Sequence, residues 1–221
     1  MSYNVAIDGP AGAGKSTIAK AVARKMKLIY VDTGAMYRAM ALYLMREKVD
    51  PQDAGAIASG CEGADITIRY ENGMQVVYLN GENVNSLIRT EEVGNMASVT
   101  SVQPAVRRKL VLLQQKLAAQ SDCIMDGRDI GTCVLPCADV KIYLTASSTV
   151  RARRRFDELK ARGEECDLKR IQDDIEERDY RDMHREISPL TQAKDAVLVD
   201  TSEMTLQQVI DTVIRICEEK R

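Results

Sequence analysis

The feature that most constrains this chain is a glycine-rich stretch near its N-terminus, Gly9-Pro-Ala-Gly-Ala-Gly14-Lys15-Ser16. The stretch fits the pattern G-x-x-x-x-G-K-[ST]. It follows residues 3–8, whose apolar run predicts a buried strand, and it precedes residues 15–26, whose apolar side chains recur at helical spacing. Backbone N–H groups in such a turn curl around phosphate oxygens, and a helix N-terminus favours anions. The sequence therefore predicts a phosphate-binding loop between a strand and a helix.

This loop predicts a site for a nucleoside triphosphate, which we expect to be ATP. A glycine turn followed by a chance Lys-Ser is the alternative, and the flanking strand and helix argue against it. Lys15 would place a cation against the β- and γ-phosphates, and the Ser16 hydroxyl would bind Mg²⁺. The predicted ATP-binding residues are Gly9, Pro10, Ala11, Gly12, Ala13, Gly14, Lys15, Ser16 and Thr17.

Composition excludes several other classes of protein. The 221 residues carry 31 Lys+Arg against 33 Asp+Glu, and aromatic residues make up 4%, so we expect no nucleic-acid partner. No apolar run approaches the ~18 residues of a membrane span, and no signal peptide is evident. The six cysteines form no C-x-x-C pair and there is one His, which argues against zinc and for reduced thiols in the cytoplasm. Without an extended apolar interface motif, we expect a monomer.

The order of predicted elements indicates an α/β fold with a parallel sheet flanked by helices. Two Asn-Gly pairs, Asn72-Gly73 and Asn80-Gly81, follow strand-like runs, so residues 61–90 are expected to form a small antiparallel insert. We assign residues 1–60 and 91–221 to the core. Strands are predicted at 28–31, 65–70, 74–79, 122–126, 140–145 and 196–200, and helices at 34–46, 105–120, 148–182 (mostly helical) and 205–218.

Arginines near predicted turns point to a second phosphate. These arginines are Arg38, Arg107 and Arg128, with a further set in residues 151–185, which hold eleven basic and eleven acidic residues. Fixed guanidinium groups would hold a phosphorylated acceptor and spread transition-state charge. The Asn-Lys-x-Asp element of guanine-reading GTPases does not occur in the sequence. The pattern therefore favours phosphoryl transfer over a nucleotide-dependent binding switch.

Three further segments carry a family resemblance over essentially the whole chain. Together with the phosphate loop, Asp32-Thr-Gly-Ala-Met-Tyr-Arg38, Asp126-Gly-Arg-Asp-Ile-Gly131 and Glu177-Arg-Asp-Tyr-Arg-Asp-Met-His-Arg185 resemble bacterial cytidylate kinases. The resemblance implies a P-loop core, an enlarged acceptor-binding insert and a helical lid, here at about residues 148–185. It implies transfer of phosphate from MgATP to CMP or dCMP in pyrimidine metabolism.

The resemblance also assigns roles to individual residues. Arg38, Arg128 and Arg185 match the positions at which members of the family bind the acceptor phosphate. Ser98, Arg107 and Asp129 match the positions at which they recognise cytosine. Asp182, with Arg178, falls at the ribose hydroxyls, Arg181 joins the lid arginines, and Thr33 stands where many relatives have Ser. The implied CMP-binding set is Thr33, Arg38, Ser98, Arg107, Arg128, Asp129, Arg178, Asp182 and Arg185. The implied catalytic set is Lys15, Asp126, Arg128, Arg181 and Arg185.

Several assignments have open alternatives. Asp126 ends an apolar strand and either orients Mg²⁺ through water or caps the strand end. Asp129 either reads the base, positions Mg²⁺ or anchors the turn from Gly127 to Gly131. Of the adjacent Arg107 and Arg108, we expect Arg107 to point inward. Which of Arg151, Arg153, Arg154 and Arg155 contacts ATP stays open, as does a kinase acting on UMP or a phosphate-free acceptor.

Overall fold

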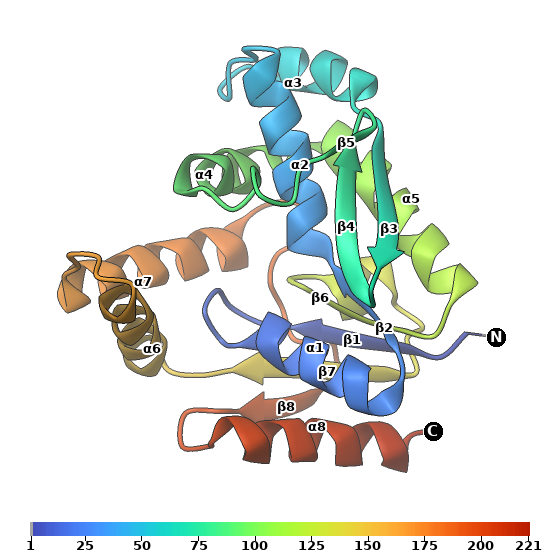
Figure 1. Ribbon diagram of the computed structural model, residues 1–221, viewed down its shortest axis with the longest axis vertical. Helices are drawn as coiled ribbons and strands as arrows, with labels where there is room; N and C mark the ends of the chain where they lie inside the picture. The colour runs from blue at the N-terminus through green and yellow to red at the C-terminus, as the bar shows by residue number, and fades with distance from the viewer. Residues whose placement is uncertain (1) are drawn as a thin grey trace. The chain divides into compact units, whose positions relative to one another are not determined.

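The structure is a computed structural model that describes residues 2–221. The chain divides into two compact units. We call residues 3–28 and 122–221 the P-loop unit, and Ser2 with residues 29–121 the hairpin unit (Figure 1). No helix within residues 2–221 is long and apolar enough to cross a membrane.

The P-loop unit is built on parallel strands. β1 (Asn4–Asp8) pairs with β6 (Cys123–Gly127) on one side and β7 (Val140–Thr145) on the other, and β7 pairs with β8 (Val197–Asp200). The residues of β1 from Val5 to Ile7 are fully buried. Their continuous apolar run is typical of a parallel strand covered on both faces. The predicted parallel sheet flanked by helices is confirmed.

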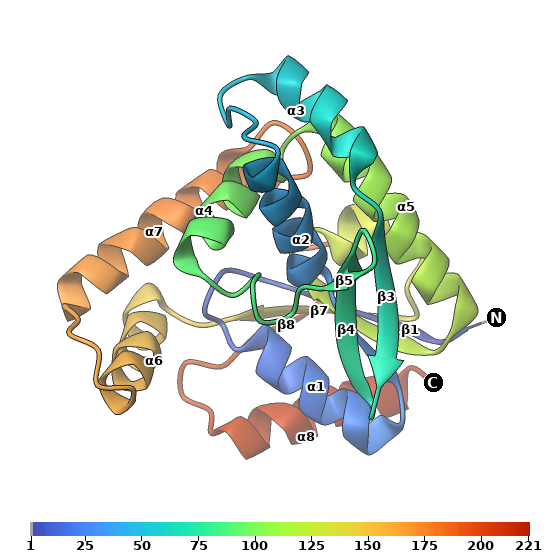
Figure 2. The same ribbon diagram turned by 45° about the horizontal axis from the view of Figure 1, so that its top comes forward.

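Four helices accompany these strands. α1 (Lys15–Met26) packs against β6 and α8 (Leu206–Glu219), and α6 (Ser148–Ala161) packs against α7 (Leu168–His184), as Figures 1 and 2 show. The sequence predicted one mostly helical stretch from 148 to 182. The stretch is mostly helical, as predicted, and consists of α6 and α7. It is interrupted where Gly163 takes a φ of +76° and Asp167 caps α7 by accepting from the Arg170 N–H. A π-helical turn, η2 (Ile130–Val134), follows β6.

The hairpin unit contains β2 (Ile29–Asp32), α2 (Thr33–Arg46), α3 (Ala54–Gly60) and the short turn η1 (Cys61–Gly63). The antiparallel strands β3 (Ile66–Glu71), β4 (Met74–Leu79) and β5 (Glu82–Asn83) come next. Both Asn-Gly pairs have positive φ at both residues, the geometry of a tight hairpin turn. The predicted antiparallel sheet is confirmed, and β4 packs against α2.

Two helices complete the hairpin unit, α4 (Glu91–Thr100) and α5 (Pro104–Gln120). The sequence pattern predicted the second, at residues 105–120, but neither α4 nor the short α3. The start of α4 carries a recognisable signal, because Thr90 accepts from the Val93 N–H and two glutamates occupy the first turn. α4 packs against α2 (Figure 2).

Candidate active site

The phosphate loop has the backbone that its glycines permit. Gly9, Gly12 and Gly14 have φ values of +148°, +74° and +86°, a region that side chains disfavour. A Cβ at Gly9 would also overlap the Leu144 carbonyl oxygen of β7. Gly14 precedes α1 and no side chain caps that helix, so the first N–H groups of α1 remain available to an anion.

Lys15 is held across the loop that it terminates. Its Nζ donates to the Pro10 carbonyl oxygen at 2.6 Å, and the residue is 6% exposed. Burial, and next the positive charge of Arg128, lower the pKa of Lys15 well below its usual value, while Asp126, Asp8 and Asp182 oppose that shift. The ammonium group is therefore fixed and desolvated before any phosphate binds.

Ser16 and Asp126 form an oxygen pair beside the loop. The Ser16 hydroxyl donates to Asp126 Oδ2 at 2.7 Å, and the buried carboxylate ends β6. Mg²⁺ is usually bound by one or two protein oxygens together with substrate phosphates. No group of three or more His, Cys, Asp or Glu that could hold a metal occurs within residues 2–221. This donor set fits an ion that arrives with a nucleotide.

A cluster of charged side chains follows β6 and ends α7. Arg128 Nε donates to Asp182 Oδ2 at 2.8 Å, and Arg185 Nη2 lies 3.6 Å from Asp129 Oδ1. Burial alone would raise the pKa of Asp182, but Arg128, with Arg178 and Arg185, outweighs burial and lowers it. The structure thus brings five predicted site residues of the P-loop unit together.

Arg181 lies apart from this cluster. Its side chain is 55% exposed, and its Nε is 3.8 Å from Glu177 Oε1, one turn earlier on α7. Such an exposed pair contributes little to stability.

Sequence reasoning left the arginines of α6 unresolved, and the structure separates them. Arg151 is 4% exposed and donates to the carbonyl oxygens of Ala146 and Ala11, at 2.8 and 2.9 Å. It also donates to Asp179 Oδ2 at 2.6 Å. Arg151 therefore ties the phosphate loop to α6 and α7. By contrast, Arg153 and Arg155 form exposed pairs within α6, and Arg154 contacts Thr201.

Replacing Arg151 by lysine is expected to lower the free energy of unfolding by about 1–2 kcal/mol. A lysine keeps the charge but lacks the fork that reaches three acceptors. Urea denaturation measures the loss. Arg153→Lys is the matched control, with a change within about 0.5 kcal/mol at an exposed site. Equal losses in the two variants would contradict this role of Arg151.

The remaining predicted residues belong to the hairpin unit. Thr33 is buried at the start of α2, and Arg38 lies on the same helix beside Gly94 of α4. Ser98 is half-buried on α4, and its carbonyl oxygen accepts from the Ser101 hydroxyl. Arg107 is 5% exposed and donates to the Tyr37 hydroxyl at 3.3 Å.

The orientation predicted for Arg107 is confirmed. Its neighbour Arg108 is exposed, as expected for consecutive residues of one helix. The unit also fixes Asp32, which caps α2 by accepting from the Ala35 N–H and pairs with Arg89 at 2.7 Å. Asp32 was quoted in a motif but received no role from the sequence.

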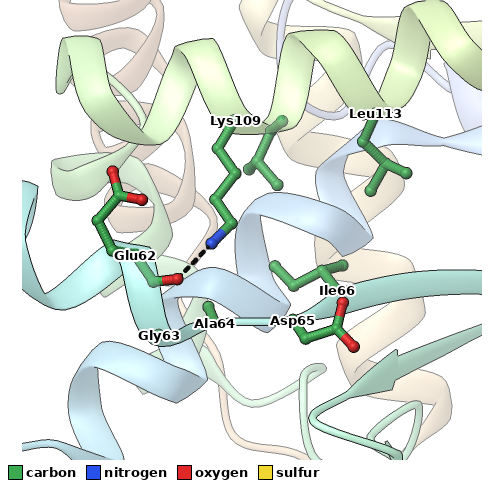
Figure 3. A pocket seen from close by; sticks show the side chains of 8 residues that line it. Glu62, Gly63, Ala64, Asp65, Ile66, Lys109 and Leu113 are labelled. Atoms are coloured by element: carbon green, nitrogen blue, oxygen red, sulfur yellow. Dashed lines mark hydrogen bonds between the residues drawn. The ribbon is translucent and has the colours of Figure 1, made fainter.

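A separate cavity of about 260 Å³ lies in the hairpin unit (Figure 3). Apolar side chains of Ile66, Leu110 and Leu113 line it with Lys109. The Lys109 ammonium group donates to the carbonyl oxygens of Cys61 and Glu62, at 3.0 and 2.7 Å. It thereby holds η1 against α5, and the cavity is smaller than most ligand pockets. None of the predicted site residues lines it.

The loop, its buried lysine, the Ser16–Asp126 pair and the arginine cluster define a P-loop kinase. Solved structures agree on the fold. Shikimate kinase from Bacteroides thetaiotaomicron matches with a TM-score of 0.50 at 14% identity, over 98% of both chains. A gluconokinase from Sinorhizobium meliloti 1021 matches with a TM-score of 0.50 at 12% identity, over 98% of this chain and 92% of that one.

Sequence comparison gives the family. The family model described as Cytidylate kinase matches residues 5–219. Cytidylate kinase from Lactobacillus gasseri is 48% identical over 98% of this chain and 94% of its own length. That from Geobacillus sp. (strain WCH70) is 44% identical over 99% and 98%. The chain belongs to the cytidylate kinase family and is a phosphotransferase, which disfavours the binding-switch alternative.

Proposed function

We propose that this chain transfers the γ-phosphate of MgATP to CMP or dCMP, giving ADP and CDP or dCDP in pyrimidine nucleotide metabolism. The observation that carries the proposal is the grouping within the P-loop unit. There, the fixed Lys15, the Ser16–Asp126 pair and the half-buried Arg128–Asp182 pair occur in a chain of this family. We expect the protein to work in the cytoplasm as a monomer.

On the donor side, the loop binds ATP through its backbone N–H groups. Lys15 then neutralises charge between the β- and γ-phosphates. Ser16 would hold Mg²⁺, and Asp126, which accepts the Ser16 hydroxyl, would orient its water shell. When bound, the ion offsets the negative charge that the β- and γ-phosphates share.

On the acceptor side, Arg38, Arg128 and Arg185 bind the CMP phosphate, and Asp182 with Arg178 binds the ribose hydroxyls. Thr33 supplies a hydroxyl to the same substrate, and Arg181 adds charge from the lid. The Arg128–Asp182 pair has low exposure, with side chains 20% and 13% exposed, so its geometry is fixed in advance.

The chemistry needs no general base. The second pKa of a phosphate monoester is about 6, so the attacking oxygen is already anionic at neutral pH. The protein aligns two anionic substrates and neutralises their charge, while a closed lid would exclude water and limit ATP hydrolysis. The single His, His184, stacks on Tyr180 at the surface and takes no part.

The base is read by Ser98, Arg107 and Asp129. Cytosine presents an N4 amino donor beside the N3 and O2 acceptors, whereas uracil presents an O4 acceptor and an N3–H donor. An ionised carboxylate only accepts, so Asp129 suits N4 and repels O4. Arg107 donates to N3 or O2, and the Ser98 hydroxyl adapts to either.

Replacing Asp129 by asparagine is therefore expected to weaken the preference for CMP over UMP by about 1–3 kcal/mol, or roughly fivefold to 150-fold. An amide donates to O4, so the use of UMP is expected to rise. Specificity constants for CMP and UMP in the wild-type protein and the variant measure the ratio. The wild-type values by themselves test the proposed reaction.

An unchanged CMP/UMP ratio would remove Asp129 from the base-reading set. If the ratio is unchanged and turnover falls equally with both nucleotides, Asp129 serves the turn or the metal. Asp122→Asn is the matched control, because this exposed carboxylate accepts the Tyr3 N–H at 2.7 Å. The control is expected to leave the ratio unchanged.

A further inference from the structure

A buried carboxylate that received no role from the sequence lies at the end of β1. Asp8 is 4% exposed. Its Oδ1 accepts from the Ile130 N–H and its Oδ2 from the Gly131 N–H, both at 2.7 Å. Each oxygen thus takes one backbone donor from a segment more than a hundred residues away in the sequence.

These two donors belong to the first residues of η2, the π-helical turn. The first N–H groups of any helical turn lack partners within it, and a side chain at the preceding position often supplies one. Asp129 occupies that preceding position, yet its side chain caps nothing, while its carbonyl oxygen accepts from the Cys133 and Val134 N–H groups. Asp8 caps the turn from β1 instead.

The carboxylates of Asp8 and Asp129 therefore differ in what they contact. Asp8 supplies the cap hydrogen bonds to Ile130 and Gly131 that the Asp129 side chain does not make. Asp129 stays 5% exposed, with Arg185 Nη2 at 3.6 Å from Oδ1. The packing is close: a Cβ at Gly131 would lie 3.4 Å from Asp8 Oδ2 and 3.2 Å from Lys141 Cδ.

We propose that Asp8 is a positioning residue for base selection. By capping η2 it holds the Asp129 carboxylate in the orientation that accepts from the cytosine amino group. The inference rests on the proposed function, in which Asp129 reads the base. It adds a specificity-determining residue that itself touches no substrate.

Burial also changes the ionisation of Asp8. Burial raises the pKa of Asp8 to about 6, although the Gly131 and Ile130 N–H groups and Lys15 oppose the shift and Asp129 adds to it. Because the pKa rises on folding, ionised Asp8 costs stability above pH 6, and that cost disappears as the pH falls toward the ordinary value.

The test is the CMP/UMP ratio of specificity constants in Asp8→Asn. The amide keeps one acceptor oxygen and turns an NH₂ group toward the other backbone N–H, so one cap is lost. We expect the ratio to fall by about tenfold, the upper range for the net effect of one lost hydrogen bond, with the ATP KM changed less than threefold. In an Asp129→Asn background, Asp8→Asn is expected to change the ratio no further.

Asp139→Asn is the matched control. This carboxylate accepts the Asn4 N–H at 2.7 Å, at the other end of β1, and is expected to leave the ratio unchanged. If circular dichroism shows that Asp8→Asn does not fold, Asp8→Ser, whose hydroxyl accepts one N–H without charge, replaces it with the same expected fall.

An unchanged ratio in a folded Asp8 variant, with a wild-type protein that prefers CMP, overturns this inference alone. A further fall in the Asp129→Asn background also overturns it, because Asp8 would then act on specificity by another route. A wild-type protein without CMP-dependent ADP release overturns the proposed function and this inference with it.

Discussion

Replacing Lys15 by alanine is expected to lower kcat by about 10³-fold, the upper range for removing one preorganised charge donor from a transition state. The ammonium group is held at 2.6 Å from the Pro10 carbonyl oxygen within the loop. Residues 9–17 include no other positively charged side chain, so none can replace it. ADP release at saturating MgATP and CMP measures the effect. Lys25→Ala is the control, because Lys25 lies on the same helix in an exposed pair with Asp211.

The fold should survive the loss of Lys15. The side chain serves a ligand, and burial already lowers its pKa, so removing its charge relieves a desolvation cost. Urea denaturation of Lys15→Ala is expected to show little loss of stability. Near-normal kinase activity in this variant would contradict the assignment of residues 9–17 as the ATP-binding loop.

Replacing Arg128 by alanine is expected to lower kcat/KM for CMP by about 10²-fold, since a hydrogen bond to a charged group contributes ~1.5–3 kcal/mol. The variant also leaves the Asp182 carboxylate, whose side chain is 13% exposed, without its partner at 2.8 Å. The KM for ATP is expected to change far less. Arg153→Ala, at an exposed pair on α6, is the control.

The companion variants Arg38→Ala and Arg185→Ala test the same contact with the acceptor phosphate. Arg38 lies on α2, and Arg185 caps the C-terminal end of α7. Each is expected to lower kcat/KM for CMP more than it raises the KM for ATP. Values within about threefold of the wild type, far less than a lost charge-assisted hydrogen bond, would identify these arginines as surface charges.

Much of the fold was predictable because its signals are local. The phosphate loop follows from glycine spacing, and the hairpins follow from two Asn-Gly pairs that take positive φ. α4 was missed although Thr90 and two glutamates mark its start and Val93, Met96 and Ala97 recur at helical spacing. Its ten residues include a glycine and an asparagine, which weaken a helix prediction. The break between α6 and α7 was missed because the dense charge pattern continues through it.

Site residues were predictable where they belong to a sequence motif. They were not predictable where contacts with residues far away in the sequence determine their role. Nothing near Arg151 in the sequence separates it from its arginine neighbours, since the carbonyl oxygen of Ala11 that it reaches is 140 residues away. Asp8 shares this property: its partners Ile130 and Gly131 become neighbours only because β1 and β6 pair in parallel. Pairings between distant strands have no local sequence signal.

The central claim is that this chain moves phosphate from MgATP to a cytidine monophosphate. The most direct test measures ADP release from MgATP with CMP, dCMP, UMP, AMP or no acceptor. The account predicts rapid release with CMP and dCMP, weaker release with UMP, and almost none with AMP or without an acceptor. ADP release that is independent of the acceptor, or faster with UMP or AMP than with CMP, would contradict it.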